Sequence, residues 1–299
     1  GRFHMQHLGV TPGGCMDLES FLISNALVQN SSEEGVLEFA YQGPLLKLVQ
    51  GRTKIAITGN VIFQIIKKNQ ETTKGECYRT YAIEEGDQID ILSTKNSAYG
   101  YMALQGGFDI KPFSKSISTL LRAQIGPNEG QKIKINDKLN IKKNSKSKKN
   151  FLVKFSNKNI KTVRVLKGPQ FDYFSNESKK DFFSRDYKIT NLTDRMGMRL
   201  EGPTIKNILS ANIRSEGITK GAIQVPADGQ PIVLLTDYPT IGGYPKIASV
   251  ISADYHLLVQ KIPGEKFKFK NVELNEAEQL YKEHLNNISQ IIKNIEEIN

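Results

Sequence analysis

The chain has 299 residues, of which 38% are hydrophobic and 24% charged, and its formal net charge is +10. This length suffices for one large domain or two ordinary ones, each with its own core. No apolar run approaches the roughly 20 residues that a membrane helix needs. The opening GRFHMQHLGV lacks a charged start followed by an apolar core, so we expect no secretory signal, no membrane association and a cytoplasmic location.

The positive charge is concentrated in one stretch. Much of the excess lies in KKNSKSKKN (142–150) and in Lys154, Lys158 and Lys161. A lysine run without interleaved aromatic residues is typical of a solvated linker, so no nucleic-acid partner is predicted. Cys15 and Cys77 are isolated and show no CxxC or Cys/His pattern. The sequence therefore indicates neither a disulfide framework nor a metal site, in keeping with a reducing compartment.

The N-terminal half predicts a loop, one helix and then closely spaced strands. Gly13 and Gly14 permit a turn, and Asp17 is a good N-cap for a helix that runs to about Val28. A glycine pair before a helix N-terminus can also bind an anion, although helix capping explains it equally well. Residues 36–104 contain short β-branched or aromatic runs separated by turns, and QKIKI (131–135) reads as a last strand. A compact barrel or sandwich over 1–141 is predicted.

The C-terminal half follows a basic linker at 142–160. We predict a strand in TVRVLKGPQ, a helix from a Ser175 cap through Phe183, and two short strands flanking Asp194 and Arg195. A short helix over 253–260 and a strand in PGEKFKFKNV complete a domain over 161–273. The periodic apolar residues after 274 predict a C-terminal helix over 274–299.

The stretch from Ser215 to Ile251 is the most informative of the chain. Its dense glycines and prolines fix tight turns and hold polar side chains in definite positions. Hairpin corners of an ordinary β-barrel would show the same glycines and prolines. The chemical variety of the polar residues favours a site; they are Ser215, Glu216, Gln224, Gln230, Asp237, Tyr244 and Lys246.

Several familiar catalytic motifs are missing from the sequence. It contains no GxxxxGK[ST] phosphate loop, no GxGxxG after a strand and no GxSxG elbow. The four histidines show no spacing for a triad or a metal. Any ATP would bind to partner chains or to an unfamiliar site.

Five blocks that occur in order suggest a particular family. They are GRFHMQHLGVTPGGCMD, LEFAYQGP, ALQGGFD, TDRMGMRLEGP and SEGITKGAIQVPADGQPIVLLTDYPTIGGYPKIASVISAD. In these blocks the chain resembles the carboxyltransferase subdomain A/B family over residues 1–270. That family includes the C subunit of bacterial 5-oxoprolinase (PxpC), KipA, and the protein called allophanate hydrolase subunit 2.

The resemblance implies a mainly β fold of two cyclophilin-like β-barrel domains with a few short helices and a C-terminal helix. It implies a subunit that works with KipI/PxpB-type and LamB/YcsF-type partners in an ATP-dependent opening of 5-oxoproline to glutamate. Two alternatives stay open. One is a role in urea metabolism, either as a biotin-dependent carboxyltransferase that acts on urea, with biotin supplied by another chain, or as allophanate hydrolase subunit 2. The other is a non-catalytic, KipA-like antagonist of a kinase inhibitor.

The same resemblance implies the site residues. Arg195 and Lys246 are expected to bind an anionic group or a ureido oxygen, while Asp194 or Glu216 orients these cations or acts as a base. A structural Asp194–Arg195 network is the alternative. Gln224 and Gln230 offer both a donor and an acceptor to an amide. The other expected substrate-binding residues are Gly13, Gly14, Asp17, Gly106, Gly107, Ser215, Pro226, Gly242, Gly243 and Tyr244.

Two positions depart from the family pattern. Gln105 and Ile117 stand where arginines are usual. Because those arginines would suit an anionic group, the substrate of this chain can differ from that of its relatives.

Overall fold

A computed structural model describes residues 1–142 and 149–298 and divides into two compact units. The barrel unit comprises Gly1–Met16, Pro112–Lys132 and Lys158–His284. The two-sheet unit comprises the described residues of Asp17–Lys111, Ile133–Asn157 and Leu285–Asn299. The chain is mainly β, as predicted.

The barrel unit is built on a closed barrel whose strands follow the order β10-β17-β14-β15-β12-β11-β18. The pairs are antiparallel except for the parallel pair β10–β18. The strands are β10 (Thr162–Lys167), β11 (Tyr187–Thr193), β12 (Gly197–Glu201), β14 (Ala222–Gln224), β15 (Ile232–Leu234), β17 (Lys246–Val250) and β18 (Lys266–Asn271).

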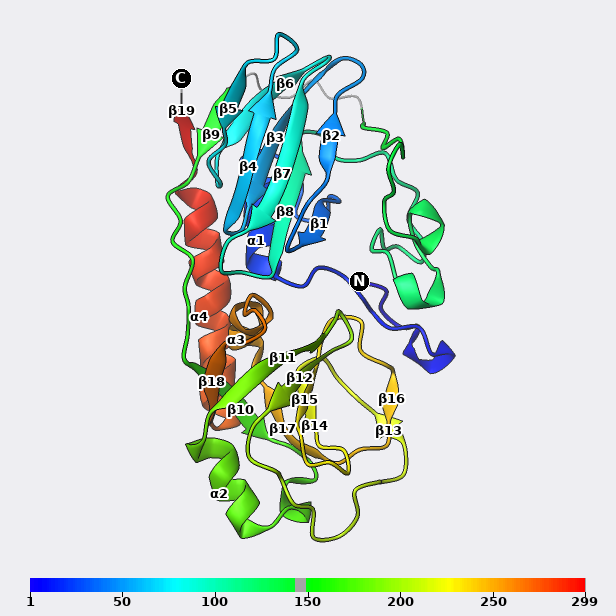
Figure 1. Cartoon of the computed structure of the whole chain (residues 1–299), viewed down its shortest axis with the longest axis vertical. Coiled ribbons are helices and arrows are strands. Elements are labelled where there is room, and N and C mark those ends of the chain that lie inside the picture. Colours follow the sequence, from blue (N-terminus) through cyan, green and yellow to red (C-terminus); the bar gives the residue numbers. More distant parts are fainter. Residues whose placement is uncertain (143–148, 299) are drawn as a thin grey trace. The chain divides into compact units, whose positions relative to one another are not determined.

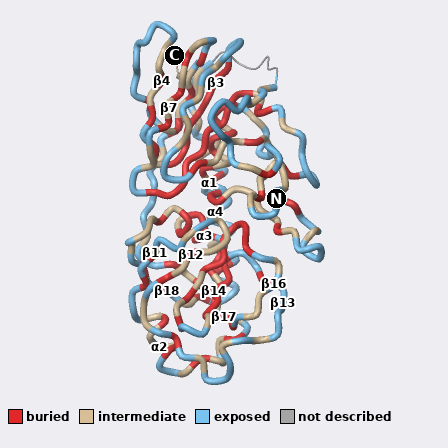
Figure 2. The backbone as a smooth tube through the Cα atoms, turned by 45° about the vertical axis from the view of Figure 1, so that its right-hand side comes forward, coloured by how far each residue is buried: buried red, intermediate tan, exposed pale blue. Residues whose placement is uncertain are grey.

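Alternating side chains explain why these segments close into a barrel. In KFKFKN of β18, Phe267 and Phe269 are buried while the lysines point to solvent. Phe269 stacks on Phe182, with ring centroids 4.7 Å apart, and packs against Tyr187 at 5.5 Å. Such aromatic packing contributes about 0.5–1.5 kcal/mol per pair beyond area burial. Figure 2 shows buried backbone along β14 and β17, the two strands that carry the site described below.

Short helices and one small sheet complete the barrel unit. Helix α2 (Asn176–Ser184) begins after Ser175, whose hydroxyl accepts from the Ser178 backbone N–H at 3.1 Å, which confirms the predicted cap. Helix α3 (Ser252–Val259) follows β17. The strands β13 (Glu216–Gly217) and β16 (Ile241–Gly242) pair outside the barrel. The 3₁₀-helices of the unit are η1 (Gln6–Leu8), η2 (Leu121–Ala123), η3 (Asn128–Gly130) and η4 (Phe171–Tyr173).

The two-sheet unit contains two four-stranded sheets, of order β1-β8-β3-β6 and β2-β7-β4-β5. Phe63, Ile83 and Met102 belong to the buried cluster that strands of both sheets share. Helix α1 (Leu18–Leu27) packs on β3 and β8 and begins at the predicted cap, Asp17. The strands are β1 (Leu37–Ala40), β2 (Leu45–Lys47), β3 (Arg52–Thr58), β4 (Val61–Ile66), β5 (Thr72–Lys74), β6 (Thr80–Glu84), β7 (Gln88–Thr94), β8 (Tyr99–Leu104), β9 (Asn150–Leu152) and β19 (Glu296–Ile298).

Helix α4 (Leu274–Lys293) begins where the periodicity predicts but ends earlier than residue 299. Residues 296–298 form β19, which pairs with β9, and this pairing replaces the last helical turn that the prediction included. Ala277 packs in the core of the barrel unit, and Ile291 and Ile292 pack in that of the two-sheet unit. Among the described residues, no helix combines the length and the hydropathy that crossing a bilayer requires.

The predicted strand at QKIKI is wrong. Residues 131–135 have no regular structure, and Ile135 is 93% exposed. Alternation produces a strand only where one face is buried against a core. A turn follows instead, in which the Lys134 N–H donates to the Asp137 carboxylate at 2.7 Å.

The predicted boundaries at 141 and 161 do not coincide with the two compact units. Gly1–Met16 and Pro112–Lys132 belong to the barrel unit because their residues bond to its loops, as in the hydrogen bond from Arg122 to the Met196 sulfur. Of the predicted basic linker 142–160, residues 143–148 lie outside the described residues, and residues 150–152 form β9. Independent folding of 1–141 and 161–273 stays a prediction.

Candidate functional site

Lys246 and Gln224 face each other across two barrel strands. Lys246 is the first residue of β17, and Gln224, the last residue of β14, is its direct partner in the antiparallel ladder. Directly opposite side chains share one face of a sheet. Both residues are only 5% exposed. The strand pairing therefore places an ammonium and an amide together in a largely dry environment.

Glu216 brings a carboxylate to this pair. It forms an ion pair with the Lys246 Nζ through Oε1, and its side chain is 44% exposed against 6% for Lys246. The hydrogen bond with Lys246 is the main cause that lowers the pKa of Glu216, and a hydrogen bond from Gln170 Nε2 at 2.8 Å adds to it. Glu216 is thus held in its charged form at the exposed edge of the cluster.

Two buried donors in the cluster keep hydrogen-bonding capacity that the described residues do not use. Among the described residues, the Gln224 Nε2 has no acceptor, and the Lys246 Nζ has none beyond its ion pair with Glu216. A buried donor without an acceptor costs about 1–3 kcal/mol, more for a charged group. Such donors are expected where a ligand supplies the missing oxygen atoms.

The backbone of the IGGY segment lies so close to the cluster that glycine is needed there. A Cβ at Gly242 would lie 2.5 Å from Gln224 Nε2, and one at Gly243 would lie 3.4 Å from the Ser215 hydroxyl. Gly242 is also the ladder partner of Glu216. Tyr244 follows and is 40% exposed. The structure therefore brings together five of the predicted site residues, Ser215, Glu216, Gln224, Gly242 and Lys246, and their role in a site stays a prediction.

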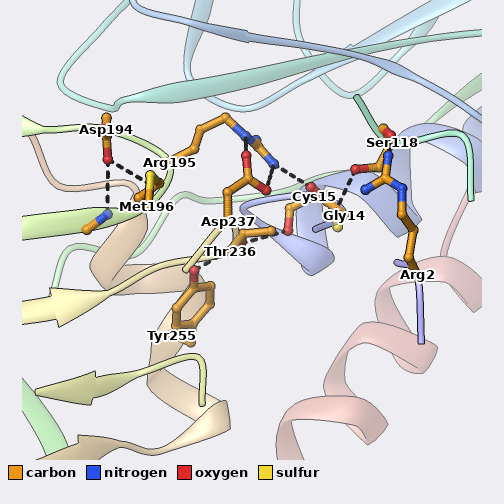
Figure 3. Close-up of polar contacts among 11 residues, drawn as sticks. Arg2, Gly14, Cys15, Ser118, Asp194, Arg195, Met196, Thr236, Asp237 and Tyr255 are labelled. Atoms are coloured by element: carbon orange, nitrogen blue, oxygen red, sulfur yellow. Dashed lines mark hydrogen bonds and ion pairs between the residues drawn. The ribbon is translucent and has the colours of Figure 1, made fainter. Parts of the chain in front are cut away.

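Arg195 belongs to a second cluster, shown in Figure 3. Its Nε donates to Asp237 Oδ2 at 2.7 Å, and its Nη2 donates to Asp237 Oδ1 at 3.2 Å and to the Gly14 carbonyl at 2.7 Å. The Gly14 N–H donates to Ser118 Oγ at 2.9 Å. Arg195 thereby ties the Gly13-Gly14 loop to the loop after β15.

Asp194 is not the partner of Arg195. Its carboxylate accepts from the backbone N–H groups of Met196 at 2.7 Å and Gly197 at 3.0 Å, which closes the turn between β11 and β12. Asp194 is exposed, and a side chain committed to its own turn in this way is common in hairpin corners. Its expected role in orienting a cation stays a prediction without a contact in the structure that supports it.

The remaining predicted residues have local partners. The Gln230 side chain bonds to both backbone groups of Gly202, at 2.9 and 3.3 Å, and Pro226 accepts from Gly229 in a turn. Asp17 caps α1 through Ser20 in the two-sheet unit. Gly106 and Gly107 adopt positive φ there, and a Cβ at Gly107 would overlap Glu34 at 2.3 Å. Each of these contacts explains its residue without a ligand.

Sequence reasoning missed Gln170 and gave Asp237 no role. Gln170 lies 46 residues before Glu216 and 76 before Lys246, yet it contacts both. Asp237 is 42 residues from Arg195. The available signals were the Gly-Pro turn that stops β10 immediately before Gln170, and the position of Asp237 directly after a buried strand.

The chemistry of the Lys246 cluster suits a neutral or anionic group with a carbonyl oxygen. Its one carboxylate is already paired with an ammonium, so a metal ion would find too few free oxygen ligands. The amide of Gln224 and the ammonium of Lys246 can donate to an oxygen atom, and Glu216 can accept from an N–H. A water-excluded cluster of this kind stabilises negative charge that develops on a carbonyl oxygen.

Comparison with known proteins identifies the family to which the chain belongs. Residues 8–271 match the carboxyltransferase domain, subdomain A and B. The chain is 30% identical to the C subunit of 5-oxoprolinase from Haemophilus influenzae, over 100% of this chain and 95% of that protein. It is 31% identical to the C subunit of 5-oxoprolinase from Escherichia coli, over 93% of this chain and 88% of that protein. The chain belongs to the carboxyltransferase subdomain A and B family.

A solved structure extends the comparison to the fold. The crystal structure of the Kluyveromyces lactis urea carboxylase superposes with a TM-score of 0.86 at 26% identity. The match covers 97% of this chain and 27% of that chain. This chain therefore corresponds to about a quarter of that longer protein.

Proposed function

We propose that this chain is the C subunit of an ATP-dependent 5-oxoprolinase, which opens 5-oxoproline to glutamate. The support is its full-length similarity to two proteins of that name. In this proposal the chain works in the cytoplasm with KipI/PxpB-type and LamB/YcsF-type subunits, and the complex uses the ATP.

The observation that carries the proposal is a pair of buried donors beside the Glu216 carboxylate: Gln224 Nε2, which has no acceptor among the described residues, and Lys246 Nζ, which has none beyond Glu216. In a lactam ring the C=O and the N–H point to the same side. Gln224 Nε2 and Lys246 Nζ would donate to the lactam oxygen, and the lactam N–H would face Glu216. The hydrogen-bonding capacity that the described residues leave unused at these two donors would then be satisfied, which recovers part of the cost of their burial.

The proposed chemistry follows from this arrangement. As the carbonyl carbon is attacked, charge develops on its oxygen, where Lys246 and Gln224 donate most strongly. One water adds across the C–N bond: its oxygen joins the carbonyl carbon to form the new carboxylate of glutamate, the C–N bond breaks, and a proton of the water goes to the nitrogen, while the complex hydrolyses ATP. Each hydrogen bond that strengthens in the transition state lowers the activation free energy by on the order of 3 kcal/mol.

A second candidate is carboxyl transfer from a carboxybiotin carried by another chain to urea. The structural similarity to a urea carboxylase favours it. Urea and the ureido ring of biotin present the same C=O and N–H edge as a lactam, so the Lys246 cluster suits them equally.

The experiment that separates these candidates is reconstitution. The chain is co-expressed with KipI/PxpB-type and LamB/YcsF-type subunits, the complex is purified, and glutamate release from 5-oxoproline is measured with and without ATP. ATP-dependent release that requires this chain supports the proposal. A stable complex without release, together with carboxylation of urea by carboxybiotin, supports the second candidate. A complex that supports neither reaction indicates a KipA-like binding role.

A further inference from the structure

Gln170 is bonded to Lys246 and Glu216 at the same time. Its side-chain Oε1 accepts from the Lys246 backbone N–H at 3.1 Å, and its own backbone N–H donates to the Lys246 carbonyl at 3.3 Å. Its Nε2 donates to Glu216 Oε1 at 2.8 Å. Gln170 is 9% exposed. Gln170 therefore holds both the backbone of Lys246 and the carboxylate of Glu216 in place.

The backbone before Gln170 is placed by close contact with β17. The Gly168 N–H donates to the Ile247 carbonyl at 2.9 Å. A Cβ at Gly168 would lie 2.2 Å from the Lys246 carbonyl oxygen, so only glycine permits this approach. Gln170 is the N-cap residue of η4, and its side chain is bonded to the first residue of β17.

Glutamine is the side chain that these contacts require. One end must accept from a backbone N–H while the other donates to a carboxylate, and an uncharged amide does both. Glutamate would keep the acceptor but place a second negative charge beside Glu216. Methionine has nearly the same length, but its thioether is a weak acceptor and has no N–H to donate.

We propose that Gln170 is a positioning residue of the Lys246–Glu216 pair: it holds the carboxylate against the ammonium so that both face the substrate amide. The catalytic part of this inference rests on the proposed function. The positioning itself is a property of this chain and can be measured without activity.

The first test measures the ionisation of Glu216 in the full chain by carbon NMR of labelled glutamate carboxyls, with Glu216→Gln used to assign the signal. Because Gln170 donates to the charged carboxylate and helps to lower its pKa, Gln170→Met is expected to raise the pKa of Glu216 above that in the wild type. Gln170→Glu is expected to raise it further. The matched control is Gln279→Met, because Gln279 Nε2 donates to Glu283 Oε1 at 2.9 Å on the exposed face of α4. That variant should leave the Glu216 signal unchanged.

An unchanged Glu216 pKa in folded Gln170→Met would overturn the inference. If Gln170→Met does not fold, the same measurement is made on Gln170→Glu, which keeps the acceptor for the Lys246 backbone N–H. An unchanged Glu216 pKa in that variant would overturn the inference as well. In the reconstituted complex, Gln170→Met is expected to lower kcat by about 10- to 100-fold and to move the acid limb of the pH profile upward. A rise in KM alone with an unmoved acid limb would contradict positioning. Absence of glutamate release in the wild-type complex would refute the proposed function and leave the NMR result to decide the inference.

Discussion

Arg195 and Asp237 form a two-point ion pair, with Nε 2.7 Å and Nη2 3.2 Å from the two carboxylate oxygens. Asp237 is nearly buried, with a side chain 6% exposed, whereas that of Arg195 is 23% exposed. The same guanidinium also donates to the Gly14 carbonyl. This arrangement favours a structural role for Arg195, the alternative that the sequence analysis left open, although with a partner other than Asp194.

We expect Arg195→Leu to destabilise the protein. Removing the guanidinium leaves the nearly buried Asp237 carboxylate without its hydrogen-bonded cation. That loss costs about 3–5 kcal/mol for a fully buried pair, and less here because Arg195 retains some solvent exposure and Arg2 also interacts electrostatically with Asp237. Urea denaturation monitored by circular dichroism measures the change. Asp237→Asn in the Arg195→Leu background should recover part of the loss, since the uncompensated charge is removed. Equal unfolding free energies for wild type and Arg195→Leu would show that the pair contributes little.

The features that could be predicted from the sequence are those that depend on residues close together in the chain. The cap at Asp17, the cap at Ser175 and the alternation in β18 depend on neighbours a few residues away, and the structure confirms them. Ile133 and Ile135 alternate in the same way but have no core to face. Composition alone does not reveal that difference.

The candidate site was predictable only in part for the same reason. Glycine and proline spacing predicted that Glu216, Gln224 and Lys246 lie beside tight turns of one segment, in definite positions. Which cation meets which carboxylate depends on the ladder that sets β14 against β17 and β13 against β16. Gln170 follows the C-terminal end of β10 and reaches the site through a hydrogen bond with the Lys246 backbone. No local sequence pattern predicts that contact.

We expect Lys246→Met to abolish most of the proposed activity. The methionine fills similar volume but cannot donate to a developing oxyanion, so kcat/KM for 5-oxoproline should fall by at least about 100-fold. The control is Lys261→Met. Lys261 is equally buried and is bonded to Asn159 at 2.8 Å and Glu265 at 3.2 Å, in the loop after α3. It should lose stability but retain kcat/KM. Similar losses of kcat/KM in both variants would indicate that burial of a lysine, not its position in the site, matters.

The Glu216–Lys246 pair should make stability depend on pH in a defined direction. The folded protein lowers the pKa of Glu216 below its ordinary value of 4.5, chiefly through Lys246. In the acid range, Glu216 therefore binds more protons in the unfolded chain than in the folded protein. Its contribution to the unfolding free energy is present above the pKa that it has in the unfolded chain, and it is lost as the pH falls through its pKa in the folded protein. The wild type should be more stable than Glu216→Gln near neutrality, and this difference in unfolding free energy should shrink as the pH falls below 4.5. Because Glu216 is nearly half exposed, the gap will be small. Urea denaturation of both proteins across this range measures it, and a gap independent of pH would contradict the pairing.

Gly168→Ala tests whether the close approach to β17 shapes the site. The added methyl group would lie 2.2 Å from the Lys246 carbonyl oxygen and 2.8 Å from the Ala248 nitrogen, both backbone atoms that move only with the strand. We expect a loss of about 2 kcal/mol or more in unfolding free energy, as overpacking against a rigid neighbour produces. Gly217→Ala is the matched control, because its Cβ would meet nothing within 4 Å. The two variants are compared by urea denaturation and by glutamate release. If Gly168→Ala matches Gly217→Ala in both, the segment before Gln170 is more adaptable than its contacts indicate, and the placement of Gln170 does not depend on this glycine.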